Sequence, residues 1–159
     1  PAIQKRYIDL FFAQLPIYAD SNFYRIMATG IESSKDSIIL GLGPATFRDL
    51  CPTIIEQSSK FKCFNHPHNF YVQFMTEVGI VGLISGSLMI ISIVWAAFAG
   101  WRKNRANVAA ATAFVIPFGL FFPIQTTGDF FGQWNNIFMW SAVALALAAA
   151  RTLSWSQNK

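Results

Sequence analysis

Residues 78–99 carry no charged side chain, and this uncharged run constrains the fold more than any other feature of the sequence. A helix needs about 20 mostly apolar residues to cross the hydrocarbon core of a bilayer. A helix is favoured there because it pairs its own backbone hydrogen-bonding groups. The chain as a whole is 53% hydrophobic and 13% charged, which is too apolar for an ordinary soluble domain. We therefore predict an all-α membrane protein.

Two more apolar stretches follow this run and complete a membrane region over residues 78–153. Small residues early in the first stretch would let neighbouring helices pack closely. The sequence therefore predicts three transmembrane helices, over residues 78–99, 106–123 and 134–150.

The distribution of positive charge predicts which way these helices are inserted. Basic residues gather in the loop 101–105 and near the C-terminus. Positively charged loops mark the cytoplasmic side of a membrane. We therefore expect the tail 154–159 to be cytoplasmic, and residues 1–77 and the loop 125–133 to lie on the outer side. The net charge of +4 does not indicate a nucleic-acid partner, because the other basic residues are scattered.

The outer region 1–77 shows the pattern of amphipathic helices. Asp20 or Ser21 can cap a helix of about four turns. Another short helix is expected after Pro44. The apolar stripe of the first helix contains Phe23, Ile26, Met27, Gly30 and Ile31, at helical spacing.

Cys51 and Cys63 are the two cysteines of the chain, and both lie in this outer region. In an oxidising compartment they are expected to form a disulfide, which closes a loop of about a dozen residues and contributes roughly 2–3 kcal/mol. The alternative is two buried free thiols. A zinc site built from these cysteines and the histidines is disfavoured, because their spacing matches no common structural pattern. We expect no metal and no cofactor.

Residues 66–79 bring both histidines of the protein directly before the first span. Pro67 disfavours a helix at the preceding residue, and helical spacing begins near His68 or Asn69. We expect a helix that begins there and continues into the bilayer. Its N-terminus would offer unpaired N–H groups to a phosphate and would keep a nearby histidine neutral, as a general base must be.

Four segments together resemble a known family. They are Asn-Phe-Tyr-Arg at residues 22–25, Gly-Leu-Gly-Pro-Ala-Thr-Phe at 41–47, His-Pro-His-Asn-Phe-Tyr-Val-Gln at 66–73, and Glu-Val-Gly-Ile-Val-Gly at 77–82. In this order they resemble the C-terminal portion of the O-antigen ligase and O-antigen polymerase family of bacterial inner-membrane glycosyltransferases. The resemblance extends over essentially the whole chain.

The resemblance implies that a glycan is transferred from undecaprenyl pyrophosphate to a hydroxyl acceptor, such as the lipid A core. It implies a polytopic helical fold of the GT-C type that works without metal or nucleotide. It also implies that this chain is a C-terminal fragment, whose region 1–77 is periplasmic and whose upstream spans carry further arginines. The fragment alone is then expected to be inactive.

The resemblance also assigns roles to single residues. His68 is expected to be the catalytic base, and Arg25 to bind the pyrophosphate. His66 is a weaker candidate that could merely shape the turn. From their positions rather than from the resemblance, Asn69 is expected to cap the helix rather than bind substrate, and Glu77 to orient Arg or His side chains rather than carry out catalysis.

Each assignment has a structural alternative. His68 could simply hold its loop, and Arg25 could be an ordinary surface arginine on an amphipathic helix. The rival to the enzyme is a non-catalytic membrane protein for transport or assembly. Within the enzyme class, an O-antigen ligase, a polysaccharide polymerase and a pilin glycosyltransferase share these motifs.

Overall fold

The computed structural model describes residues 4–56 and 60–155, and within these ranges the chain is helical and has no strand. This agrees with the all-α prediction. The chain divides into two compact units, one of residues 1–84 with 123–131 and one of residues 85–122 with 132–159. The helices are η1 (Gln4–Asp9), α1 (Leu10–Gln14), α2 (Asn22–Ser34), η2 (Lys35–Ser37), α3 (Phe47–Ile55), α4 (Phe70–Gln73), η3 (Phe74–Val78), α5 (Gly79–Lys103), α6 (Val108–Leu120) and α7 (Gln133–Trp155).

One helical run among the described residues, Phe70–Lys103, is long and apolar enough to cross a membrane. It contains the first of the three predicted spans. Helix α6 is apolar but has only 13 residues. Helix α7 has 23 residues but is not among the helices that are both long and apolar enough. The structure therefore gives one candidate span, and the other two remain predictions. Of the predicted tail 154–159, residues 156–159 lie outside the described residues, and α7 continues through Trp155.

Helix α2 begins where the sequence predicts, because the Ser21 side chain accepts a hydrogen bond from the amide of Tyr24 at 3.0 Å. Its buried face includes Ile26 and Gly30 of the predicted apolar stripe but is otherwise shifted from it. Ile31 is 54% exposed, whereas Thr29 is fully buried. The buried face follows small and hydroxyl-bearing residues because it packs against the backbone and small side chains of other segments. A Cβ at Gly30, for example, would lie 2.7 Å from a methyl group of Val72.

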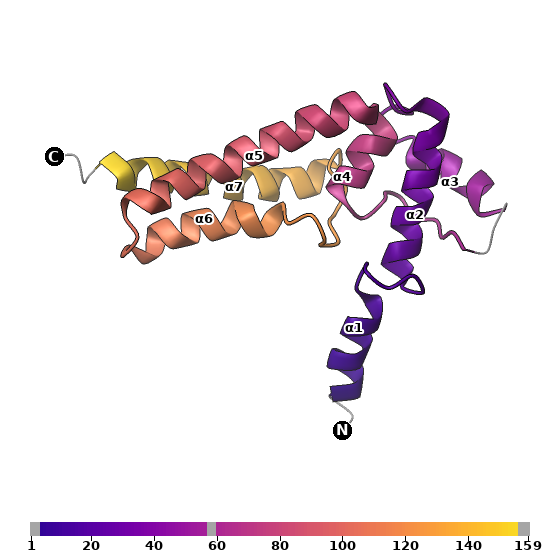
Figure 1. Ribbon diagram of the computed structural model, residues 1–159, viewed down its shortest axis with the longest axis horizontal. Coiled ribbons are helices and arrows are strands. Elements are labelled where there is room, and N and C mark those ends of the chain that lie inside the picture. The colour runs from indigo at the N-terminus through magenta and orange to yellow at the C-terminus, as the bar shows by residue number, and fades with distance from the viewer. Residues whose placement is uncertain (1–3, 57–59, 156–159) are drawn as a thin grey trace. The chain divides into compact units, whose positions relative to one another are not determined.

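Helix α3 lies beside α2 in unit 1 (Figure 1). Cys51 on α3 is fully buried and is joined to Cys63 by a disulfide with a Cα–Cα distance of 5.5 Å. This is the pairing expected from the sequence. Ile26 of α2 and Phe47 of α3 pack with Cys51 in a small core. The disulfide therefore ties the segment after residue 60 to the α2–α3 pair.

The predicted single helix from residue 69 into the first span is interrupted at Gly79. Residues 74–78 form a π-helix, and Gly79 has a φ of 71°. The backbone groups that this break releases are paired by residues 38–43. The amides of Leu42 and Gly43 donate to the carbonyls of Thr76 and Glu77 at 3.0 and 2.9 Å. In return, the amide of Ile80 donates to the carbonyl of Ile38 at 2.8 Å.

We call residues 38–43 and 74–81 together the joint. Two glycines allow its two backbones to approach so closely. A Cβ on Gly41 would collide with the backbone between Glu77 and Gly79, and a Cβ on Gly79 would collide with the carbonyl of Ile39. Gly41 also has a positive φ, of 72°, a region that glycine alone occupies without strain. The joint therefore explains why glycines stand at these two positions.

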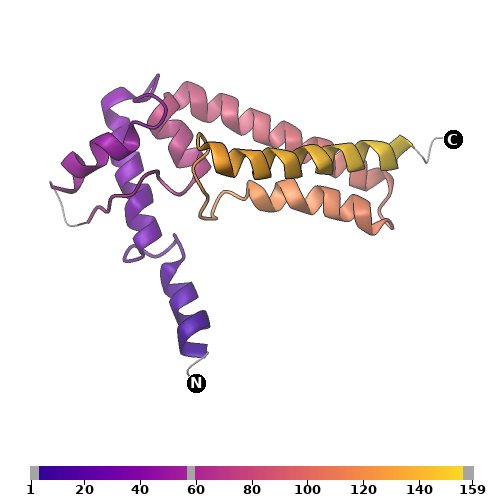
Figure 2. The ribbon, with the colours of Figure 1, turned by 180° about the vertical axis from the view of Figure 1, so that it is seen from behind.

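In unit 2, α5, α6 and α7 run side by side, as both Figure 1 and Figure 2 show. The ring of Phe114 on α6 packs against Phe98 and stacks on Trp101 of α5, with centroid distances of 5.3 and 5.4 Å. Gly100 of α5 lies against Ala150 of α7, where a side chain would not fit. Small and aromatic residues thus hold the three helices together.

Replacing Gly79 with alanine is predicted to destabilise the protein by about 2 kcal/mol or more. The added Cβ would occupy a left-handed backbone position and collide with the carbonyl of Ile39. Gly119 of α6 is the matched control, because a Cβ there meets nothing within 4 Å. Gly119→Ala should change stability by no more than about 1 kcal/mol. Thermal unfolding in detergent measures both, and equal effects of the two variants would contradict the account.

Candidate functional site

The two histidines lie together in an aromatic cluster within unit 1. The ring centroids of His66 and His68 are 4.3 Å apart. Phe64 packs against His68 at 4.5 Å, and Phe23 of α2 contacts the same imidazole edge to face at 5.3 Å. We call Phe23, Phe64, His66 and His68 the histidine cluster. It gathers residues from α2 and from the segment that precedes α4.

The backbone at His68 adopts an uncommon conformation, with a φ of 57°. Residues other than glycine occupy this region rarely, and local interactions must compensate for its strain. Here the carbonyl of His68 accepts a hydrogen bond from the amide of Thr127 at 2.8 Å, and Nε2 of His66 lies 3.2 Å from the carbonyl of Thr127. Thr127 thus holds both histidine positions from the 123–131 segment.

Burial lowers the pKa of His68 below its ordinary value of 6.5, and the neighbouring charge of His66 lowers it further. A hydrogen bond with the Thr127 backbone acts in the opposite direction, as the smallest of the three effects. Among the described residues, His66 is the titratable group whose charge changes the pKa of His68. At neutral pH the imidazole of His68 is therefore uncharged, which is the state that a general base requires.

Asn69 is the N-cap of α4, as predicted. Its side-chain oxygen accepts hydrogen bonds from the amides of Tyr71 and Val72 at 3.0 and 3.2 Å. Its amide nitrogen donates to the carbonyls of Pro123 and Gln125 at 2.8 and 3.3 Å. Asn69 therefore occupies two of the N–H groups at the helix N-terminus where a phosphate is expected, and the phosphate site stays a prediction.

Glu77 is 1% exposed, and its described partners differ from the arginine or histidine that the sequence suggested. The side-chain amide of Gln73 donates to Glu77 at 3.2 Å and to Asp129 at 2.6 Å. The backbone amides of Ala45 and Phe47 also donate hydrogen bonds to the Glu77 carboxyl group. Since α3 begins at Phe47, the carboxyl group of Glu77 lies at the N-terminus of this helix. Its role in the described structure is to connect the joint to α3.

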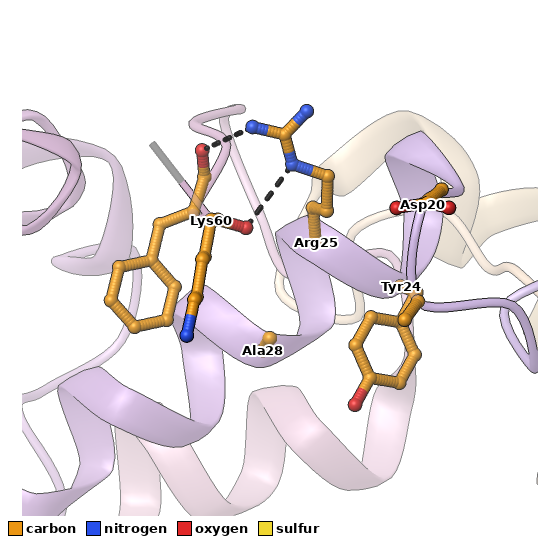
Figure 3. Close-up of a pocket in the computed structure, with 7 residues that line it drawn as sticks. Asp20, Tyr24, Arg25, Ala28 and Lys60 are labelled. Carbon is orange, nitrogen blue, oxygen red and sulfur yellow. Dashed lines mark hydrogen bonds between the residues drawn. The ribbon is translucent and has the colours of Figure 1, made fainter. Parts of the chain in front are cut away.

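Arg25 lies away from these contacts, beside a cavity of about 600 Å³ (Figure 3). Its guanidinium donates to the backbone carbonyls of Lys60 and Phe61 at 3.1 and 3.4 Å. Figure 3 shows the side chain directed toward Lys60, while Tyr24 points elsewhere. Residues two apart on a helix do not share a face, so Arg25 and Phe23 leave α2 in different directions. The structure thus brings His66, His68 and Asn69 together and places Arg25 in a separate pocket.

Several residues of the site carry no signal in the sequence. Phe23 and Phe64 enclose His68, and Thr29 bonds to both backbone groups of Lys62. The contacts of Phe23 with His68 and of Thr29 with Lys62 join residues more than thirty positions apart, so no local pattern reveals them. Gln73 and Asp129 are likewise joined only by the fold.

The described residues contain no group of three or more His, Cys, Asp or Glu side chains placed to hold a metal ion. Comparison with protein-family models, curated proteins and solved structures found no match to this chain. The resemblance to the O-antigen ligase family therefore remains a prediction.

His68 is predicted to titrate below pH 6.5, which NMR of the imidazole C–H signals measures directly. Because this pKa is lower in the folded than in the unfolded protein, the unfolded state binds the proton first as the pH falls. Stability should therefore decrease on acidification below about pH 6.5, and His68 should contribute no such change above it.

His66→Gln provides the matched comparison for this titration. Removing His66 removes the smaller of the two lowering effects and keeps burial, so the pKa of His68 should rise only part of the way. A midpoint at or above 6.5 in the unaltered protein would show that the cluster does not keep His68 neutral.

Proposed function

We propose that this chain is part of a bacterial inner-membrane glycosyltransferase of the O-antigen ligase type. In this proposal a glycan passes from undecaprenyl pyrophosphate to a hydroxyl group of the lipid A core. The observation that carries the proposal is the neutral, partly buried imidazole of His68. His68 lies directly before the candidate span Phe70–Lys103, and the nearby Phe64 is exposed. The order of the four motifs that resemble the family supports it.

The proposed step is a displacement at the anomeric carbon of the donor glycan. The acceptor oxygen forms a bond to this carbon as the bond to the pyrophosphate oxygen breaks, and the electron pair leaves with the pyrophosphate. The imidazole of His68 accepts the proton of the attacking hydroxyl. The growing negative charge on the leaving group then needs cationic or N–H partners.

Arg25 is the proposed cationic partner of the pyrophosphate in this chain. It lines the 600 Å³ cavity together with Lys60 and Asp20, so two cationic residues and one acidic residue border this space. A guanidinium has five N–H donors, so it can bind a backbone segment and still present positive charge. However, it leaves α2 on a different face from Phe23, the residue that contacts His68. Arginines of the upstream spans are proposed to supply further charge.

The proposed topology accompanies this function. Three spans over 78–99, 106–123 and 134–150 would place residues 1–77 in the periplasm, where carrier-linked glycans are joined, and the C-terminus in the cytoplasm. One candidate span supports membrane association.

A second candidate function, a non-catalytic membrane protein for assembly or transport, is favoured by one observation. The polar residues that follow His68 have structural partners: Asn69 caps α4, and Gln73 links Glu77 to Asp129. Since these polar groups stabilise the fold, their presence is explained without a catalytic role. The two candidates differ in what they predict for His68.

His68→Ala and His68→Gln are predicted to reduce glycan transfer by about a hundredfold or more, the usual contribution of a general base. The amount of protein in the membrane should stay unchanged. The assay complements a strain that lacks the gene and reads the lipopolysaccharide banding pattern, with immunoblotting for protein level. Bare core with accumulated carrier-linked chains indicates a ligase, and capped single repeats indicate a polymerase.

His66→Gln is the matched control. Its rate of glycan transfer should stay within about tenfold of that of the unaltered protein, because His66 packs against His68 without acting as the base. Arg25→Gln, tested beside it, should weaken use of the donor more than Arg25→Lys does. Normal transfer by the His68 variants would refute the proposed base. Loss of transfer in proportion to lost protein would instead favour the non-catalytic candidate.

A further inference from the structure

In the segment that leads to the histidines, both backbone polar groups of Lys62 contact one buried hydroxyl group on α2. Thr29 is fully buried. Its Oγ1 accepts a hydrogen bond from the amide of Lys62 at 3.1 Å and lies 2.9 Å from the carbonyl of the same residue. It also lies 2.8 Å from the carbonyl of Arg25, so its one hydrogen can donate to either carbonyl. Thr29 thus contacts both backbone polar groups of Lys62.

We propose that Thr29 is a positioning residue that sets the backbone at Lys62 and thereby places Phe64 against the imidazole of His68. The proposal deepens the proposed function, since it rests on His68 as the base of that site. Thr29 itself touches neither histidine in the described contacts and acts through the 62–64 segment.

The other contacts of this segment do not replace Thr29. The disulfide holds Cys63 to α3, and the ammonium group of Lys62 donates to the side chain of Asn22 on α2 at 2.8 Å, but neither of these contacts pairs both backbone groups of Lys62. Arg25 binds the carbonyls of Lys60 and Phe61, which lie further from Phe64 along the chain. Only a group that pairs both the N–H and the C=O of residue 62 fixes the direction in which the chain continues. Thr29 is that group among the described contacts.

The consequence for His68 follows from the packing of Phe64. Its ring lies 4.5 Å from the imidazole, two residues beyond Lys62. Burial is the largest cause of the lowered pKa of His68, and the Phe64 ring is one of the groups packed against this imidazole. If Phe64 turns away, water reaches the imidazole and the pKa moves back toward 6.5. The histidine cluster then loses the environment that keeps His68 neutral.

Thr29→Val tests the proposal, because valine keeps the shape of threonine but has no hydroxyl group. Hydrogen exchange at the Lys62 amide should become about tenfold faster, as expected when one hydrogen bond is lost. The NMR titration midpoint of His68 should move toward 6.5. Thr29→Ser keeps the hydroxyl group and should restore both readouts. The full chain is used, in detergent.

Ser33→Ala is the matched control. Ser33 is also buried on α2, one turn later, and its hydroxyl donates to the carbonyl of Thr29 within the same helix at 2.8 Å. This variant should leave the Lys62 amide and the His68 titration unchanged. The proposal is overturned if Thr29→Val changes neither readout, if Ser33→Ala changes them equally, or if Thr29→Ser fails to rescue.

Neither readout requires transferase activity, so the failure of this inference is distinguishable from failure of the proposed function. If the two readouts respond as predicted and His68 variants still transfer glycan, Thr29 positions the cluster while the proposed base is wrong. If the proposed function holds, Thr29→Val should also move the acid limb of the transfer rate toward higher pH, and a merely destabilised protein would not show that shift.

Discussion

The backbone contact between residues 38–43 and 74–81 is the interaction on which unit 1 depends. A helix that breaks at Gly79 releases carbonyls and amides, and a buried unpaired group of this kind costs about 1–3 kcal/mol. The joint pairs these groups with Leu42, Gly43 and Ile38, at distances of 2.8–3.0 Å. Such close pairing is possible only because Gly41 and Gly79 lack a Cβ. Two short sequence motifs far apart in the chain therefore form one structural unit.

The joint connects the helix break to the rest of unit 1 by contacts on both sides. Thr76, inside the π-helix, donates to the carbonyl of Gly30 on α2. The carboxyl group of Glu77 accepts hydrogen bonds from the backbone at the start of α3. Asn69, at the N-terminus of the same helical run, binds the 123–125 backbone, and Thr127 holds the histidines. The position of His68 is thus fixed from α2, from the joint and from the 123–131 segment. Such preorganisation is what the proposed role of His68 as a base would require.

Sequence alone reveals the parts of this structure that depend on neighbouring residues. Ser21 and Asn69 are recognisable as helix caps because capping uses amides two or three positions away. The cysteines are few enough that their pairing follows from the compartment. The break at Gly79, the buried position of Thr29 and the contact of Phe23 with His68 could not be predicted. Each of them depends on a partner brought close only by the fold, and a threonine or glycine in an apolar stretch carries no mark of that partner.

The role of the joint is tested most directly by hydrogen exchange at the amides of Leu42, Gly43 and Ile80 in the intact protein. These three amides donate across the joint, so they should exchange slowly and with similar rates. In Gly79→Ala all three should exchange faster together, because a Cβ at this position displaces the backbone of Ile39. Fast exchange at these amides in the unaltered protein, or unchanged exchange in the variant, would contradict the account.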